Sequence, residues 1–373
     1  METKKINFLM YSTLRTGGTR TILQYANEFQ RFGHEVSLTT LFYDDWFPLD
    51  EGIKVISKIS RLELYYFFKK SEIKNKVNRT NLGSTISFLE KLYYLTPKSD
   101  INVATFFPTA YVASWKKNEA IPFYILMHMP GLFTEDPIER IFYEDTLFLP
   151  VNKIVNSSWL QKQVKHKSGI DYPLVNTGAV DNQIFTNRHN YREQNNDKYV
   201  DIIALGKGGF KKATSIFEAV STVRRINREK VIRLHFFGRF VPKGVSIDNR
   251  LTFFHKNLSD EELAKLYSSS DIQITFSDAE SFPLPPLEAM ASGCAVITTP
   301  YGTEDYAIDE KNALIVEPNN IEMLVSRINT LVQDIDLRNK LIVEGLLTAR
   351  RFNFKDQARQ IENIFNSAIN KEC

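Results

Sequence analysis

Short apolar runs alternate with helix-like segments from the start of the chain. Ile6 to Tyr11 is an apolar run, and a Gly17-Gly18 turn follows it. Apolar residues then recur at helical spacing between Ile22 and Phe29, and Gly33 stands where a left-handed helix end is expected. Glu35 to Phe42 is apolar again. The order predicts a β-α-β unit.

The same alternation continues along the chain and weakens from about Thr177. Further strands are predicted at Ile101–Phe107, Phe123–Met127 and Lys153–Asn156. From Thr177 to Tyr199 the chain is polar and rich in asparagine, which is typical of a linker.

After this stretch a second β-α series begins. Strands are predicted at Val200–Leu205, Ile232–Phe237, Leu251–His255, Ile272–Phe276 and Ala295–Ile297, with a helix from Lys212 to about Ile226. Ser259 and Glu262 have the spacing of a capping box ahead of another helix. The end of the chain is helical, with Phe354-Lys355-Asp356 opening the last helix.

Strands that alternate with helices predict an α/β protein with parallel sheets covered on both faces. The 373 residues are enough for two domains of ordinary size. Two similar halves joined by a polar linker predict a cleft between them. Open α/β sheets bind ligands at the carboxyl ends of their strands.

Composition narrows the class of protein. Hydrophobic residues make up 43% and charged residues 24%, as in globular proteins, and the net charge of +3 is too small to predict nucleic-acid binding. The two cysteines, Cys294 and Cys373, offer no disulfide framework. No apolar stretch approaches a membrane span or a signal peptide. We expect a cytoplasmic protein.

No metal site is expected. Asp334-Ile335-Asp336 spells Asp-x-Asp but falls at a predicted helix end, and Asp44-Asp45 lacks the strand context of a metal-binding pair. No His-rich or Cys-rich spacing is present.

Residues 65–79 mix aromatic and basic side chains, beginning Tyr65-Tyr66-Phe67-Phe68-Lys69-Lys70. One interpretation is a surface that contacts anionic lipid, which would make the protein peripheral on the inner face of the membrane. The other is a half-buried helix with a solvated basic face.

The main candidate functional residues lie between Phe276 and Gly293. Glu280 falls in the loop after a strand, and Glu288 falls in the first turns of the following helix. A helix N-terminus favours phosphate, and carboxylates beside it can accept hydrogen bonds from sugar hydroxyls. The alternatives are a solvated loop acid at Glu280 and an acid that stabilises the helix dipole at Glu288.

The order of these motifs resembles the retaining glycosyltransferases of family 4, which have the GT-B fold. The resemblance lies in Gly17-Gly18-Thr19-Arg20, Gly33-His34-Glu35-Val36, Asn176 to Asp181 with Phe185, Glu280 to Gly293, Tyr301 to Asp305, and Asn312 to Val316. It implies two Rossmann-like domains with parallel sheets facing a central cleft. The implied boundaries are an acceptor domain at 1–180, a linker at 181–198, a donor domain at 199–352, and a C-terminal helix at 353–373 that returns toward the first domain.

The resemblance also implies roles for single residues. Glu280 contacts the donor sugar, and Glu288 holds the ribose hydroxyls. Lys207 and Lys212 neutralise the departing diphosphate, with Lys211 as a competing choice for the second lysine. Solvated lysines in a Gly-rich turn are the alternative.

The remaining implied contacts surround the donor. Gly17 and Gly18 approach its phosphates, and Leu258 lies near the base. Phe282 and Leu284 offer backbone donors. His128, at a predicted strand end, is either a catalytic-site residue or a structural histidine.

Two departures from the family pattern are visible. Pro283 stands where a glycine is usual, so one backbone N–H is missing from the loop. Lys207 stands where an arginine is usual, which replaces a planar fork by a point charge.

The sequence therefore predicts an enzyme that transfers a sugar from a nucleotide-diphosphate donor to a hydroxyl acceptor, with retention and without a metal or other cofactor. The acceptor class is a glycan, a polysaccharide or a lipid-linked precursor. The alternatives are a non-catalytic GT-B partner subunit and a sugar-nucleotide epimerase. A dehydrogenase is disfavoured, because Gly206-Lys207-Gly208-Gly209 lacks the third glycine of the dinucleotide motif.

Overall fold

The chain forms two compact units in the computed structural model, which describes residues 2–57, 82–128, 137–187, 198–207 and 212–372. The first unit comprises residues 1–177 together with 354–373, and the second comprises residues 178–353. The basic aromatic stretch 65–79, Lys211 and most of the expected linker lie outside the described residues.

The first unit is built on a six-stranded parallel sheet with the order β3-β2-β1-β4-β5-β6. Its strands are β1 (Lys5–Leu9), β2 (Glu35–Thr39), β3 (Lys54–Ile56), β4 (Ile101–Ala104), β5 (Ile121–Leu126) and β6 (Asn152–Val155). Its described helices are α1 (Gly17–Arg31), α3 (Leu82–Leu95), α4 (Phe107–Trp115), α5 (Pro137–Asp145), α6 (Ser158–Ser168) and α12 (Phe354–Glu372).

The second unit repeats this topology, with the sheet order β12-β11-β10-β7-β8-β9. Its strands are β7 (Tyr199–Leu205), β8 (Val231–Gly238), β9 (Thr252–Lys256), β10 (Ile272–Ile274), β11 (Ala295–Thr298) and β12 (Leu314–Ile315). Its described helices are α7 (Ala213–Ile226), α8 (Asp260–Ser268), α9 (Leu284–Ser292), α10 (Ile321–Gln333) and α11 (Ile335–Ala349).

Each sheet has the strand order of a Rossmann fold. The order reverses between β1 and β4 in the first unit and between β7 and β10 in the second. At such a switch point the connections leave in opposite directions, so a crevice opens outside the carboxyl ends of the two strands. The candidate residues after β7 and β10 therefore share one edge of the second sheet.

Side-chain alternation explains why helices cover both faces of the second sheet. Val200, Ile202 and Ala204 of β7 belong to a core cluster with Ile216 of α7, while Ile203 belongs to the opposite cluster. The sequence pattern predicted these strands correctly. It missed β3 and β12, which have three and two residues, because runs that short carry no periodic signal.

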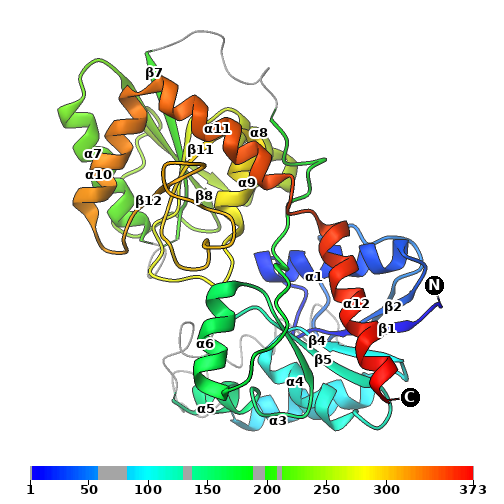
Figure 1. Cartoon of the computed structure of the whole chain (residues 1–373). Helices are drawn as coiled ribbons and strands as arrows, with labels where there is room; N and C mark the ends of the chain where they lie inside the picture. Colours follow the sequence, from blue (N-terminus) through cyan, green and yellow to red (C-terminus); the bar gives the residue numbers. More distant parts are fainter. Residues whose placement is uncertain (1, 58–81, 129–136, 188–197, 208–211, 373) are drawn as a thin grey trace. The chain divides into compact units, whose positions relative to one another are not determined.

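The last helix packs on the first unit, where Figure 1 shows α12 beside α1. Phe365 of α12 stacks on Phe29 with ring centroids 5.6 Å apart, and it also contacts Phe123. Within the described ranges, no helix is both long enough and apolar enough to span a bilayer.

Candidate active site

The central element of the candidate site is the loop from Thr275 to Pro283, between β10 and α9. Its backbone is fixed by neighbouring side chains. Thr299 Oγ1 donates to the Ser277 carbonyl oxygen at 2.9 Å, and Tyr306 Oη donates to the Pro283 carbonyl oxygen at 2.7 Å. The loop is therefore held at both ends.

Two glycines pack directly against this loop. A Cβ on Gly302 would lie 2.1 Å from the carbonyl oxygen of Glu280, and Gly302 also has a φ of +79°. A Cβ on Gly178 would lie 2.0 Å from Cδ1 of Phe282. Because real Cβ atoms cannot approach so closely, glycine is required at both positions.

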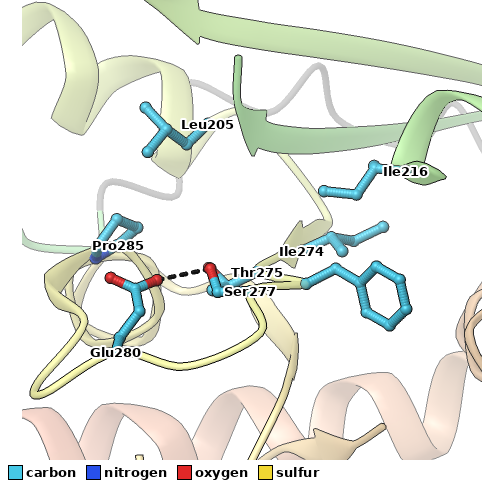
Figure 2. A pocket seen from close by; sticks show the side chains of 8 residues that line it. Leu205, Ile216, Ile274, Thr275, Ser277, Glu280 and Pro285 are labelled. Atoms are coloured by element: carbon cyan, nitrogen blue, oxygen red, sulfur yellow. Dashed lines mark hydrogen bonds between the residues drawn. The ribbon is translucent and has the colours of Figure 1, made fainter. Parts of the chain in front are cut away.

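Glu280 lies where the two central strands end. Ser277 Oγ donates to Glu280 Oε1 at 2.7 Å (Figure 2). Leu205, Ile216 and Pro285 line the same small cavity, whose volume is about 10 Å³. That volume holds about one water molecule. A sugar would therefore contact Glu280 from outside this cavity.

Lys212 reaches the same loop from the N-terminus of α7. Its Nζ lies 2.9 Å from Asp278 Oδ1, and it also donates to Asn319 Oδ1. Asn319 in turn donates to Asp278 Oδ1 at 3.3 Å. Lys212 has a left-handed backbone, with φ 51° and ψ 40°. The ammonium group is thus positioned beside the Glu280 loop and balanced by a carboxylate.

Lys207 follows β7 and is exposed. Its carbonyl oxygen accepts from the Ala213 N–H at 3.2 Å, which ties it to the start of α7. The preceding Gly206 is packed closely, since a Cβ there would lie 3.1 Å from Phe254 and 3.2 Å from the Phe237 carbonyl oxygen. Lys207 and Lys212 therefore both lie at the start of α7.

Glu288 is the fifth residue of α9 and is only 3% exposed. The helix begins at Leu284 after Pro283, and prolines occupy its second and third positions. Since proline has no N–H, only Leu284 supplies a donor among the first three residues of α9. This helix start is therefore a weaker phosphate site than the sequence pattern suggested.

The other donor-side candidates are partly or fully packed. The Phe282 side chain is buried and contacts Tyr306 and Phe352, with ring centroids 5.2 and 5.9 Å apart. Any part that it plays in ligand binding therefore belongs to its backbone. Leu284 and Leu258 are half-buried at the edge of the same core cluster, and Leu258 lies between β9 and α8.

In the first unit, Gly17 and Gly18 open α1. Thr16 caps the helix, and its Oγ1 accepts from the Thr19 N–H at 3.1 Å. The N–H groups of Gly17 and Gly18 cannot be satisfied within the helix, so they are available to an anion. A Cβ on Gly18 would lie 3.8 Å from Met127 Cε, an ordinary contact.

His128 follows Met127 at the carboxyl end of β5 and is partly buried. Its ring lies edge-on to Phe106 at 6.0 Å, and its carbonyl oxygen accepts a hydrogen bond from Tyr143 Oη. Burial lowers the pKa of His128 to about 4. The imidazole is therefore neutral near pH 7, and it can donate or accept a hydrogen bond without carrying charge.

The structure thus gathers the candidates into two groups. Glu280, Lys207 and Lys212 lie at the carboxyl edge of the second sheet, and Gly18 lies near the segment that carries His128 in the first unit. Sequence reasoning missed Asp278 and Asn319, the partners of Lys212. Asp278 stands within the recognised motif, whereas Asn319 carried no signal.

The described residues contain no group of three or more His, Cys, Asp or Glu side chains arranged to hold a metal ion. Asp334, part of the Asp-x-Asp sequence, caps α11, where its side chain accepts from the Leu337 N–H at 2.8 Å. That carboxylate has a structural role.

The fold is shared with solved structures. The whole chain superposes on sucrose-phosphate synthase from Thermosynechococcus elongatus with a TM-score of 0.76 and 16% identity, covering 99% of this chain and 100% of the other. It also superposes on HepE from Anabaena, solved with UDP-glucose, with a TM-score of 0.71 and 13% identity, covering 98% and 100%. Both comparisons show the fold, which is GT-B.

The sequence of the second unit is similar to a known family. Residues 187–346 match the model of the glycosyl transferases group 1 family. The D-inositol 3-phosphate glycosyltransferase of Corynebacterium efficiens is 28% identical over 130 residues, which cover 35% of this chain and 30% of that protein. The first curated relatives are matched over 28% to 61% of their own length. The second unit is therefore similar in sequence to the group 1 glycosyl transferases, and the chain has the GT-B fold.

Proposed function

We propose that this protein is a glycosyltransferase that moves a sugar from a nucleotide-diphosphate donor to a hydroxyl acceptor with retention of configuration. The observation that carries the proposal is the switch-point edge of the second sheet, where one fixed loop carries a carboxylate and is contacted by an ammonium group. Glu280 and Lys212 supply these groups, through the contacts with Ser277 and Asp278. The group 1 family match covers both residues.

In this proposal the two charges have different partners. The Glu280 carboxylate accepts hydrogen bonds from donor-sugar hydroxyls. Lys212 and Lys207 stabilise the negative charge that develops on the diphosphate as the sugar–oxygen bond breaks. Glu288 is assigned to the ribose hydroxyls. Because it is buried, a binding role requires the ribose to reach α9 closely.

The first unit supplies the remaining contacts. The free N–H groups of Gly17 and Gly18 approach the phosphates, and neutral His128 hydrogen-bonds the reacting sugar or the acceptor. No metal takes part, because lysines and N–H groups carry the charge stabilisation. The leaving phosphate helps to remove the acceptor proton on the same face of the sugar, which gives retention.

The donor is a nucleoside diphosphate sugar, for which UDP-glucose is the first candidate because a structure of the same fold binds it. The acceptor is a hydroxyl group of a glycan, a polysaccharide or a lipid-linked precursor. The curated relatives named for glycosyl transfer to D-inositol 3-phosphate make a phosphorylated polyol a further acceptor to include.

The test is a binding and turnover screen with UDP-, GDP-, ADP- and dTDP-sugars. Glu280→Gln keeps an oxygen for Ser277 but removes the charge, so we expect turnover to fall about 10²-fold while UDP alone still binds. Glu310→Gln, an exposed acid of the same unit paired with Arg327, is the matched control and should leave turnover unchanged. Failure of every nucleotide sugar to bind would overturn the proposal.

Two further measurements separate the finer claims. The anomeric configuration of the product, determined by NMR, tests retention. Addition of EDTA tests metal independence, since turnover should be unchanged. An inverted product or full loss of turnover with EDTA would remove the corresponding claim and leave the transferase assignment in place.

A further inference from the structure

A second cavity lies in the first unit, at the edge of the sheet opposite to Gly18 and His128. Its volume is about 430 Å³, within the size range of small-molecule sites. Lys5, Glu35 and Lys54, which line it, are the first residues of β1, β2 and β3. The cavity therefore opens at the amino ends of these strands.

The rim of this cavity is basic. Lys5, Lys54 and Lys98 line it, against a single acid, Glu35. Lys5 and Glu35 make a loose ion pair at 3.9 Å, with both side chains more than half exposed. Within the described part of the chain, Lys54 and Lys98 have no carboxylate partner. Two cations that are not neutralised face one hollow, which favours an anionic ligand.

The wall of the cavity is polar and preformed. Ser37 Oγ donates to Asn7 Oδ1 at 2.9 Å, and Ser99 Oγ donates to Asn102 Oδ1 at 3.1 Å. Asn7 Nδ2 joins the two pairs by donating to Asn102 Oδ1 at 3.0 Å. Hydroxyls fixed in this way present their remaining lone pairs to a ligand, so the wall suits a molecule with hydroxyl groups.

One residue that lines the cavity has a buried polar atom without a hydrogen-bond partner. Gln30, near the end of α1, lines the cavity, and its Oε1 is buried without a hydrogen-bond partner. A buried amide oxygen that accepts no hydrogen bond costs roughly 1–3 kcal/mol. A hydroxyl group bound in the cavity would satisfy it. The unsatisfied Gln30 oxygen is an observation independent of the charge on the rim. Together they favour a ligand that carries both hydroxyl groups and a negative charge.

From these observations we propose that the first unit binds a second ligand at the amino ends of β1, β2 and β3. The ligand is a small phosphorylated polyhydroxyl compound of monosaccharide size. Its phosphate lies against Lys54 and Lys98, and its hydroxyls meet Gln30, Ser37 and Ser99. The site is separate from the proposed donor site, because none of its lining residues is among those assigned to the donor.

The position of this cavity suggests how a ligand bound there affects the opposite end of the first unit. Helix α1 has Gln30 at the cavity and Gly17 and Gly18 at its opposite end, roughly 20 Å away for 15 residues. A ligand that holds Gln30 fixes the helix whose N-terminus is assigned to the donor phosphates.

The experiment is isothermal titration of the full chain with glucose 6-phosphate, inorganic phosphate and unphosphorylated glucose. We expect glucose 6-phosphate to bind more tightly than phosphate, and glucose not to bind. Lys54→Ala/Lys98→Ala should weaken glucose 6-phosphate binding at least tenfold. Lys117→Ala removes an exposed lysine of the same unit that does not line the cavity, so it should have no effect.

Gln30→Met tests the interior of the cavity with a side chain of similar length. Methionine lacks the amide oxygen that is offered to a ligand hydroxyl, so glucose 6-phosphate binding should weaken about tenfold, while circular dichroism and thermal unfolding check that the variant folds. Absence of glucose 6-phosphate binding to the native chain would overturn the proposal. So would binding that survives in both variants, or binding that UDP displaces competitively, since these place the ligand elsewhere.

Discussion

Gly302 controls the position of the Glu280 backbone. Its Cα lies so close to the loop that a Cβ would meet the Glu280 carbonyl oxygen at 2.1 Å, and its φ of +79° disfavours any side chain. Gly302→Ala must therefore move the loop. We expect turnover to fall at least tenfold with a modest loss of thermal stability.

The matched control for Gly302→Ala is Gly169→Ala. Gly169 has a similar φ of +72°, but a Cβ there would meet nothing within 4 Å, so no neighbouring segment need shift. Both variants are compared by nucleotide-sugar turnover and by thermal unfolding. Full turnover in Gly302→Ala would show that the loop position is not important.

Asp278 competes with a diphosphate for Lys212. The ion pair is 2.9 Å long, and its side chains are 20% and 43% exposed, so it contributes about 0–1 kcal/mol. Asp278→Asn should release the ammonium group and tighten UDP binding by up to about fivefold.

Asp309→Asn provides the comparison for Asp278→Asn. Asp309 pairs with Arg327 at 3.0 Å in the same unit and has the same 43% exposure. Titration with UDP should show tighter binding only for Asp278→Asn. If UDP binding weakens instead, Asp278 supports the site rather than competes with its ligand.

The titration of His128 makes the first unit sensitive to acid. Its pKa falls from 6.5 to about 4 through burial, so the unfolded chain binds this proton more readily than the folded one. The corresponding stability is complete above pH 6.5 and is lost as pH falls toward 4. His128→Asn should flatten the decline of the melting temperature between pH 6.5 and 4, measured by calorimetry. An unchanged decline would contradict the burial of this ring.

At the scale of elements, α12 is held by an aromatic stack and a buried polar pair. Phe365 packs on Phe29 and Phe123, and His34 Nε2 lies 2.9 Å from Glu362 Oε1. The Lys4 N–H donates to His34 Nδ1, so Nε2 carries the proton that is donated to Glu362. Burial raises the pKa of Glu362, but hydrogen bonds from Arg359 and His34 outweigh this and lower it.

Phe365→Ala should therefore destabilise the first unit by about 3–5 kcal/mol, because it removes a buried ring through which α12 packs on α1 and β5. Asn363→Ala, exposed on the same helix, is the control and should cost little. Denaturant unfolding measures both. A small effect of Phe365→Ala would show that α12 contributes little to the stability of the unit.

Local patterns predicted most elements but not their contacts. Gly33 at the end of α1 and the Ser259–Glu262 capping box could be identified because each is decided by neighbours in the sequence. The Lys212–Asp278–Asn319 contact could not, because it joins positions up to 107 residues apart. The burial of Glu288 was missed for a related reason, since packing around α9 is decided by distant segments.

At the scale of the whole molecule, each proposed ligand binds mainly to one unit. The nucleotide binds mainly to the second unit, and the phosphorylated polyhydroxyl compound binds to the first. Each unit has its own sheet and its own buried core. A ligand present at 100 times its Kd stabilises the state that binds it by about 2.7 kcal/mol. We expect UDP to slow amide exchange in Thr275–Pro283 and α9, and glucose 6-phosphate to slow it in β1, β2 and β3.

Variants test whether the two effects are separate. Lys212→Ala should remove the protection given by UDP and leave that given by glucose 6-phosphate, and Lys54→Ala/Lys98→Ala should do the reverse. The reason is that Lys212 lies in the second unit, whereas Lys54 and Lys98 lie in the first. Hydrogen exchange measured by mass spectrometry on the full chain resolves both segments in one experiment. If either variant loses both protections, the two ligands share one site, and the assignment of separate anion sites to the two units is wrong.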